Sequence, residues 1–255
     1  MICKVDSDNF TTIIPAAGRG SRLNCSRDKL NLEILGKSLL EWVLSLVANV
    51  SKRVIIIHST EVNIPRDLLQ KYTVNISLIQ QSYPYGTAHA VRMACRDINT
   101  RFTNVIWVDQ ITLLYSNLLR CLKYAQVNDQ HSLIFPVVYM ENPYVHFQIT
   151  REGKITRVLY KRENDIMPSF GLKDAGFFIF STEILKEVLD VEEYYNATLG
   201  KHTAEYNLLS VFPILENYGK GVKMLKIISY EESQDVNTDR DVATVTNIIK
   251  RRKLC

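Results

Sequence analysis

The sequence has little glycine and no long hydrophobic run. Ten glycines in 255 residues make about 4% of the chain, against roughly 7% in average proteins. With 46% apolar and 23% charged residues, the composition is that of an ordinary globular protein and excludes collagen-like, low-complexity and intrinsically disordered chains. The apolar runs, such as 12–17 and 53–57, are as long as a strand and far too short to span a membrane.

Paired cysteines and a strong net charge are also missing. The five cysteines are scattered, odd in number and without CxxC spacing, which argues against a disulfide framework and a zinc site and favours a reducing compartment. Residues 1–9 are polar and do not resemble a signal peptide, so we expect a cytoplasmic protein. The net charge is only +4, and the basic run 250–253 is expected to be a solvated helix end rather than a nucleic-acid or membrane contact.

Strand-like and helix-like segments alternate through the first half of the chain. The expected strands are 11–17, 53–58, 74–79 and 104–108, and the expected helices are 38–50, 65–72, 87–98 and 114–127. Alternation with short connections predicts an α/β fold with a doubly wound, Rossmann-like, mostly parallel sheet. Such sheets bind ligands at the carboxyl ends of their strands.

The second half of the chain has a different pattern. Strands are expected at 131–138, 147–150, 154–160, 175–180 and 221–228, with a hairpin turn at 151–153. Helices are expected at 182–189, at 205–218 with a kink at Pro213, and at 239–252. No repeat or low-complexity linker divides the chain, so we expect one domain over 1–255 with a small antiparallel subdomain.

The loop after the first strand is the most informative segment. Residues 15–23 read PAAGRGSRL, with two glycines two positions apart. Glycine lets successive backbone N–H groups face an anion, and Arg22 and Lys29 add two cations, so the spacing predicts a polyphosphate cradle. A dinucleotide fingerprint would need glycine where Leu23 stands, and the Walker A loop of a P-loop kinase would need it at Asn31. A tight turn without a ligand is the structural alternative.

Four motifs resemble one family of enzymes. Residues 16–22 (AAGRGSR) with Lys29 resemble the A-A-G-x-G-[ST]-R-x(6)-K signature of sugar-1-phosphate nucleotidyltransferases, and 35–39 (LGKSL) resemble their L-x-G-K-P-[ML] segment. Residues 81–91 (QSYPYGTAHAV) are similar to the Q-x(4)-G-T-[AG]-H-A segment in the uridylyltransferase domain of bacterial N-acetylglucosamine-1-phosphate uridylyltransferases, and 235–238 (DVNT) to their G-V-N-[TN]. The motifs follow in order along nearly the whole chain.

The resemblance implies a nucleotidyltransferase (GT-A-like) fold. Residues from about 10 to 130 would bind nucleotide, about 131–235 would bind the acceptor, and 236–255 would form a C-terminal helix. The implied reaction transfers a nucleoside monophosphate from a nucleoside triphosphate, with UTP favoured, to a sugar 1-phosphate or related phosphate and releases pyrophosphate. The implied cofactor is Mg²⁺, which prefers oxygen ligands. Hexapeptide repeats, present in the family's bifunctional members, do not occur up to Cys255, so acetyl transfer is not expected.

The resemblance also assigns roles to individual residues. Arg22 and Lys29 would bind the triphosphate, Asp109 matches the magnesium aspartate, and Asn237 matches a second, weaker metal contact. The nucleotide-binding candidates are Ala16, Ala17, Gly18, Arg19, Gly20, Gln81, Gly86 and Thr87, and the acceptor-binding candidates are His146, Lys161, Asp174 and Glu205. The structural alternatives are a cap of the following helix or turn for Asp109 and a turn for Asn237. His89 is expected to pack or hydrogen-bond on its helix.

The chain departs from the family on the acceptor side. Val108 replaces the glycine before the metal aspartate, 145–147 (VHF) replace G-Y-G, and 174–176 (DAG) replace N-T-G. We therefore expect the reaction type to be kept with an acceptor other than N-acetylglucosamine 1-phosphate.

Two alternatives to this function stay open. Residues 14–22 also resemble methylerythritol phosphate cytidylyltransferases, so the first is a CTP-dependent cytidylyltransferase acting on a polyol or amino-alcohol phosphate. Residues 86–89 argue against that subfamily, though not against CTP. The second is a catalytically inactive nucleotide-binding regulatory module, which the joint presence of Arg22, Lys29 and Asp109 disfavours. Whether the chain forms a homo-oligomer is also open.

Overall fold

A computed structural model describes residues 4–18, 29–217 and 221–254 of the chain. Its centre is a sheet whose parallel part contains β1 (Phe10–Ala16), β4 (Arg53–Ser59), β5 (Asn75–Gln81) and β6 (Phe102–Ile106). The helices of this half are α1 (Leu39–Val47), α2 (Arg66–Gln70), α3 (Thr87–Cys95) and α4 (Tyr115–Val127). This arrangement confirms the predicted α/β fold with a mostly parallel sheet.

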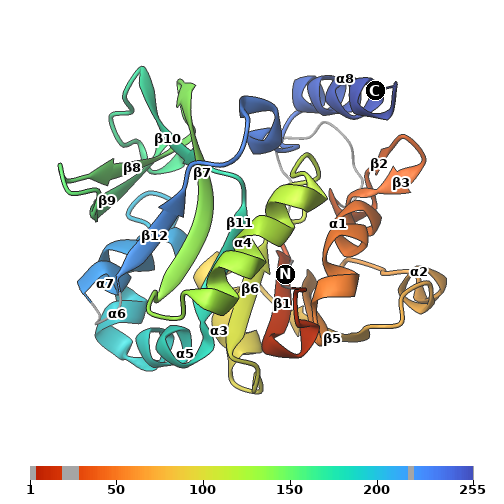
Figure 1. Ribbon diagram of the computed structural model, residues 1–255, viewed down its shortest axis with the longest axis horizontal. Coiled ribbons are helices and arrows are strands. Elements are labelled where there is room, and N and C mark those ends of the chain that lie inside the picture. The colour runs from red at the N-terminus through yellow and green to blue at the C-terminus, as the bar shows by residue number, and fades with distance from the viewer. Residues whose placement is uncertain (1–3, 19–28, 218–220, 255) are drawn as a thin grey trace.

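The second half adds antiparallel strands to the same sheet. They are β7 (Leu133–Glu141), β10 (Phe170–Asp174) and β11 (Phe177–Ser181), and the strand order is β10-β7-β11-β6-β1-β4-β5. β12 (Val222–Leu225) pairs with β7 in parallel. A separate ribbon is formed by β8 (Val145–Ile149) and β9 (Ile155–Tyr160), and a short hairpin by β2 (Glu33–Ile34) and β3 (Lys37–Ser38). The ribbon and the hairpin lie at opposite sides of the molecule (Figure 1).

Helices cover both faces of the sheet. The later helices are α5 (Thr182–Asp190), α6 (Glu192–Asn196), α7 (Phe212–Asn217) and α8 (Asp239–Leu254). Short 3-10 turns occur at Ser7–Asn9, Lys29–Asn31, Ala48–Val50, Lys161–Glu163, Leu208–Val211 and Tyr230–Ser233. Along β1, Ile14 packs with α1 and α4, whereas Ile13 packs with α3 and α5. Burial on both faces explains why the central strands are almost entirely apolar. Among the described helices, none is long and apolar enough to cross a membrane.

The predicted helix over 205–218 is wrong in its first half. Tyr206 instead forms an isolated antiparallel bridge with Leu199, and helical structure begins only with the 3-10 turn at Leu208. Pro213 is the second residue of α7 and does not kink it, because proline in the first turn costs no intrahelical hydrogen bond. The sequence pattern also missed β10 and the β2–β3 hairpin, which are short and only partly apolar.

A buried carboxylate anchors the segment that precedes α8. Glu232 is 2% exposed, and its Oε1 accepts hydrogen bonds from the amide of Asn117 (2.8 Å) and the backbone N–H of Leu114 (3.2 Å). Its Oε2 accepts from the backbone N–H and the hydroxyl of Ser229, at 3.0 and 3.1 Å. Residues 229–238, here called the connecting segment, are thereby tied to the start of α4. Satisfying all these donors is what makes burial of a carboxylate tolerable.

Replacing Glu232 should therefore cost more stability than replacing its neighbour. Glu232→Ala leaves the Asn117 amide and the Leu114 N–H without their partner, and we expect a loss of about 3 kcal/mol in the free energy of unfolding. Glu231→Ala removes only surface ion pairs with Arg251 and Arg252, and we expect a loss below about 1 kcal/mol. Urea unfolding followed by circular dichroism measures both, and equal losses would contradict the anchoring role.

Candidate functional site

Several predicted site residues lie along one edge of the parallel sheet. Ala16 ends β1, and Ala17 follows it; both are buried, and they lead into the exposed Gly18. Gln81 ends β5, and Asp109 lies in the turn that follows β6. Because these strands are parallel, their carboxyl ends share the edge at which doubly wound sheets bind ligands.

Lys29, Asp109 and Asn237 converge at this edge. The Lys29 Nζ donates to Asp109 Oδ2 at 2.6 Å and to Asn237 Oδ1 at 3.0 Å. The Lys29 and Asp109 side chains are 15% and 13% exposed, so their ion pair is partly shielded from water. Asp109 lies well before the first residue of α4 and does not cap that helix; it lies within a turn.

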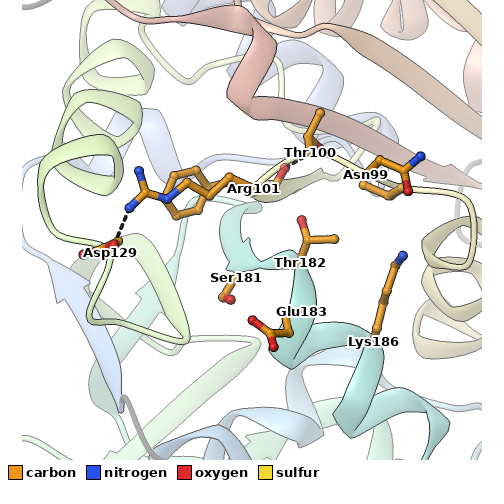
Figure 2. A pocket seen from close by; sticks show the side chains of 10 residues that line it. Asn99, Thr100, Arg101, Asp129, Ser181, Thr182, Glu183 and Lys186 are labelled. Atoms are coloured by element: carbon orange, nitrogen blue, oxygen red, sulfur yellow. Dashed lines mark hydrogen bonds and ion pairs between the residues drawn. The ribbon is translucent and has the colours of Figure 1, made fainter.

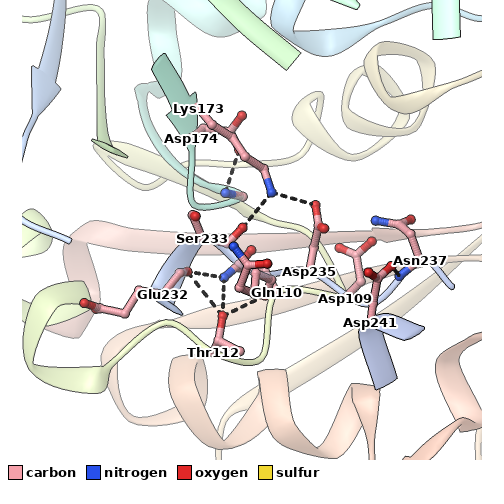
Figure 3. Close-up of polar contacts among 12 residues, drawn as sticks. Asp109, Gln110, Thr112, Lys173, Asp174, Glu232, Ser233, Asp235, Asn237 and Asp241 are labelled. Carbon is pink, nitrogen blue, oxygen red and sulfur yellow. Dashed lines mark hydrogen bonds and ion pairs between the residues drawn. The ribbon is translucent and has the colours of Figure 1, made fainter. Parts of the chain in front are cut away.

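The start of α8 fixes the backbone at Asn237. Asp241 Oδ2 accepts from the backbone N–H groups of Asn237 (3.0 Å) and Thr238 (2.7 Å). In return, the Thr238 hydroxyl accepts from the backbone N–H of Asp241 at 3.3 Å. This is the reciprocal pattern of a capping box, with Asp in place of Glu. The amide side chain of Asn237 is thus presented from a rigid helix end (Figure 3).

The connecting segment is tied to the residues around Asp109 at several points. The backbone N–H of Val236 donates to the carbonyl of Asp109 at 3.3 Å. The Gln110 amide donates to the Glu232 carbonyl at 2.6 Å, and the Thr112 hydroxyl donates to the Gln234 carbonyl at 2.7 Å. Figure 3 shows Gln110 and Thr112 bonded to the backbone of Glu232, in the same view as Asp109 and Asn237.

Lys173 joins the antiparallel half to this network. It lies on β10 and is 8% exposed. Its Nζ donates to the carbonyl of Ser233 at 2.6 Å and pairs with Asp235 Oδ2 at 3.2 Å. Sequence reasoning did not single out Lys173, Glu232 or Asp241. The spacings S-x-x-E at 229–232 and T-x-x-D at 238–241 are the signals that could have revealed the two acidic residues.

The nucleotide-binding candidates on β5 and α3 have well-defined neighbours. Gln81 Nε2 lies 2.7 Å from His89 Nδ1. Gly86 has a φ of +105°, and a Cβ there would lie 2.5 Å from the carbonyl oxygen of Tyr206. The Thr87 hydroxyl accepts from the backbone N–H of Leu208 at 3.0 Å. Arg19, Gly20 and Arg22 lie outside the described residues.

Of the predicted acceptor-binding residues, His146 and Asp174 lie against the antiparallel part. His146 Nδ1 accepts from the backbone N–H of Leu172 at 3.1 Å, and burial lowers the pKa of the imidazole. Asp174 Oδ1 accepts from the backbone N–H of Gly176 at 2.6 Å. Burial raises the pKa of the Asp174 carboxyl, although Lys173 opposes that shift. Phe147 is fully buried and cannot reach a substrate.

The other two predicted acceptor-binding residues lie near each other in the chain's loops. Lys161 is exposed in the 3-10 turn after β9. Glu205 Oε2 accepts from Arg162 Nη1 at 2.9 Å, so its carboxylate already has a cationic partner. The structure therefore brings Lys29, Asp109 and Asn237 into direct contact, and within the described residues Lys161 and Glu205 form no hydrogen bond or ion pair with them.

The oxygen atoms around Lys29 Nζ suit a magnesium ion chemically. Mg²⁺ prefers oxygen ligands and keeps several waters and phosphate oxygens, so it needs few protein groups. Asp109 Oδ2 and Asn237 Oδ1 already converge on one positive charge, the Lys29 ammonium. In the part of the chain that the structure describes, no cluster of three or more His, Cys, Asp or Glu could hold a metal. The two side chains fit Mg²⁺ whose remaining ligands are phosphate and water.

A cavity of about 420 Å³ lies at the opposite end of the parallel strands, where β6 begins. It is bordered by the start of β6 and the start of α5, and Figure 2 shows Thr100, Arg101 and Thr182 around it. The Arg101 guanidinium is paired with Asp129, and Lys186 donates to the carbonyl of Arg96 at 3.2 Å. Since ligands of doubly wound sheets bind at the opposite edge, this cavity is not the candidate site.

Comparisons with known proteins agree with this geometry. The chain matches the MobA-like NTP transferase domain family over residues 12–160. It is 26% identical over 246 residues to a bifunctional protein GlmU of Alkaliphilus oremlandii, covering 94% of this chain and 52% of that protein. It is also 26% identical over 251 residues to a bifunctional protein GlmU of Clostridioides difficile, covering 96% and 52%. The chain thus spans about half the length of the curated relatives it matches.

Solved structures share the fold. One is a 4-diphosphocytidyl-2C-methyl-D-erythritol synthase from Anaerococcus prevotii, with a TM-score of 0.66, 16% identity and coverage of 96% of this chain and 100% of that one. Another is the inositol-1-phosphate CTP transferase from T. maritima, with a TM-score of 0.66, 17% identity and coverage of 95% and 96%. The family match covers more than half of the chain and includes β1, β5, β6, Lys29 and Asp109. This chain therefore belongs to the family of MobA-like NTP transferase domains and is a nucleotidyltransferase.

Proposed function

We propose that this nucleotidyltransferase transfers a nucleoside monophosphate, with UTP as the favoured donor, to a sugar 1-phosphate or a related phosphate. The observation that carries the proposal is the convergence of Lys29, Asp109 and Asn237. Asp109 and Asn237 lie 80 and 208 positions after Lys29 in the chain. Each places a side-chain oxygen within 3.0 Å of the Lys29 Nζ, at the carboxyl ends of the parallel strands. A cation, a carboxylate and an amide oxygen at that edge are what a triphosphate with a divalent metal requires.

The proposed reaction is an in-line displacement at phosphorus. An oxygen of the acceptor phosphate forms a bond to the α-phosphorus, the bond from that phosphorus to the bridging oxygen of the β-phosphate breaks, and pyrophosphate leaves with the electron pair. When bound, Mg²⁺ neutralises negative charge on the phosphates. Asp109 and Asn237 would hold it, and the Lys29 ammonium would stabilise the charge that builds up at the α-phosphate.

The acceptor is proposed to differ from N-acetylglucosamine 1-phosphate. Two of the departures from the family pattern support this. Phe147 is fully buried among Phe135 and Phe212, with ring centroids 5.2 and 5.7 Å away. Asp174, which replaces an asparagine of the family, brings a carboxyl group with a raised pKa to the antiparallel side.

A CTP-dependent cytidylyltransferase acting on a non-sugar phosphate is the second candidate function. It is favoured by the acceptor-side changes and by the two solved structures above, one named as a diphosphocytidyl-methylerythritol synthase and the other as a CTP transferase. Both candidates use the same displacement at the α-phosphorus, and they differ in the nucleobase and the acceptor.

One experiment separates these candidates. The four common ribonucleoside triphosphates are each combined with N-acetylglucosamine 1-phosphate, glucose 1-phosphate, a polyol phosphate and an amino-alcohol phosphate, and pyrophosphate release is measured with Mg²⁺. Release with UTP and a sugar phosphate supports the first candidate, and release with CTP and a non-sugar phosphate supports the second. Efficient turnover with N-acetylglucosamine 1-phosphate alone would falsify the proposed change of acceptor. Nucleotide binding without any release would favour an inactive module.

Loss of either ion-pair partner should abolish most turnover. Lys29→Ala removes the cation proposed to stabilise charge at the α-phosphate, and Asp109→Ala removes the carboxylate. We expect kcat/KM to fall about 100-fold or more in each, with unchanged circular dichroism spectra. The control is Lys71→Ala, which removes an exposed lysine paired with Glu41 on the surface and should keep full activity. Wild-type rates in either test variant would contradict the assignment.

Asn237 should affect the metal requirement more than the maximal rate. Asn237→Ala removes one oxygen ligand, so the Mg²⁺ concentration that gives half-maximal rate should rise about tenfold, with a smaller change in the rate at saturating Mg²⁺. Asn247→Ala, an exposed position further along α8, is the matched control and should leave the Mg²⁺ titration unchanged. Identical titration curves for all three proteins would rule out a metal-binding role for Asn237.

The loop between β5 and α3 is held by a segment from the other half of the chain. Tyr206 donates its backbone N–H to the carbonyl of Tyr85 at 2.7 Å, and its carbonyl accepts from the backbone N–H of Ala88 at 2.8 Å. Gly86 lies between these two bonds, directly against the Tyr206 backbone. The proposed nucleotide-binding loop is thus tied by its backbone to the residues that precede α7.

Adding a side chain at Gly86 should therefore disturb nucleotide binding. Gly86→Ala places a Cβ 2.5 Å from the Tyr206 carbonyl oxygen and must displace one backbone, so we expect KM for the triphosphate to rise about tenfold or more. Gly153→Ala is the matched control, because that glycine also has a positive φ, +87°, but no atom within 4 Å of its Cβ position. It should lose about 1 kcal/mol of stability and keep its KM. Steady-state kinetics measure KM, and urea unfolding measures stability, for both variants. An equal KM in the two variants would contradict the role proposed for Gly86.

A further inference from the structure

A histidine on α3 contacts the residue that ends β5. Gln81 is 3% exposed, and its side-chain Nε2 lies 2.7 Å from Nδ1 of His89. Within the described ranges, this is the one hydrogen bond of the Gln81 amide that the structure shows. The nitrogen end of the amide is therefore bonded to protein, and within the described ranges Oε1 has no protein partner.

The direction of this hydrogen bond follows from the state of the imidazole. Burial lowers the pKa of His89, and the nearby Arg92 guanidinium lowers it further, so the ring is neutral at neutral pH. A neutral imidazole has one nitrogen that accepts and one that donates. With the nitrogen end of the Gln81 amide facing it, Nδ1 is the acceptor and the ring proton resides on Nε2.

A tyrosine ring lies beside the imidazole, and a second tyrosine ring lies beside the first. The Tyr85 ring lies 5.0 Å from the His89 ring, and Tyr83 lies 4.9 Å from Tyr85, measured between centroids. The backbone of Tyr85 is in turn bonded to Tyr206. His89 is therefore positioned by α3 on one side and by a fixed aromatic residue on the other.

We infer that His89 is a specificity-determining residue, which orients the Gln81 amide so that Oε1 is offered to the nucleobase as a hydrogen-bond acceptor. The inference rests on the proposed function, because it assumes that Gln81 meets the base. An acceptor fits the N3–H of uracil, which is a donor, and not the unprotonated N3 of cytosine. An amide free to rotate could present Oε1 to uracil or Nε2 to cytosine and would discriminate less.

Two replacements of His89 distinguish a hydrogen-bonding role from a role in packing alone. Leucine at this position fills space but cannot accept a hydrogen bond. Asparagine places an oxygen close to where Nδ1 lies, and it can accept from Gln81 Nε2 as the imidazole does. The pair His89→Leu and His89→Asn thus separates hydrogen bonding from volume.

The test measures kcat/KM for UTP and for CTP, with the acceptor identified by the pyrophosphate-release experiment above. Wild type should prefer UTP, and His89→Leu should lower the UTP-to-CTP ratio about tenfold or more, mainly through KM. His89→Asn should restore the ratio to within about threefold of wild type. The control is His58→Leu: that histidine is the penultimate residue of the neighbouring strand β4, and its Nδ1 lies 2.8 Å from the carbonyl of Ser59. Its loss should leave the ratio unchanged.

A spectroscopic measurement on the wild-type protein tests the same point without any variant. The ¹⁵N chemical shifts of His89 should report a proton on Nε2 and an unprotonated Nδ1 at neutral pH, and a proton on Nδ1 would overturn the inference. So would an unchanged ratio in an active His89→Leu protein, a failure of His89→Asn to restore a lowered ratio, or a wild-type preference for CTP. If no triphosphate and acceptor pair yields pyrophosphate in wild type, the proposed function itself fails.

Discussion

The ion pair between Lys29 and Asp109 organises the candidate site. It joins the segment after β1 to the turn after β6, and the Asn237 amide oxygen adds a contact from the start of α8. Both side chains are largely shielded from water, so each charge depends on the other for compensation. Such a pair adds little to stability compared with an apolar pair, but it fixes where positive and negative charge lie. The charges at this edge of the sheet are thereby in place without any ligand.

A second, larger network of hydrogen bonds holds Asn237, the third residue of this group, in place. Asn237 comes from a segment far along the chain, and that segment follows the sheet edge without forming a strand. Its geometry depends on the buried Glu232 carboxylate and on Lys173, whose ammonium reaches the Ser233 carbonyl at 2.6 Å. Buried polar networks of this kind favour one arrangement because every alternative leaves charges or N–H groups without partners. The site is therefore supported by polar contacts from both halves of the chain.

The parts of this structure that sequence could predict are those determined by local pattern. The central strands were predictable because burial on both faces produces unbroken apolar runs such as 53–57, and the edge at which the site lies followed from their parallel direction. The conformation near residue 205 could not be predicted from local pattern. Tyr206 is held in an extended conformation by backbone hydrogen bonds to Tyr85 and Ala88, more than 100 residues earlier. The role of Lys173 likewise depends on a contact 60 residues away along the chain.

The two sides of the site differ in how their residues are constrained. On the proposed nucleotide side, the candidate groups are backbone and side chains at strand and helix ends, and their spacing in the sequence is enough to predict them. On the acceptor side, position 147 carries a phenylalanine that packs against Phe135 and Phe212 in the core, so the β8–β9 ribbon is fixed by apolar packing rather than by a ligand. A ligand-binding side chain at position 147 would therefore require a different core beneath the ribbon. The displacement proposed at phosphorus uses Lys29, Asp109 and Asn237, none of which lies on the ribbon.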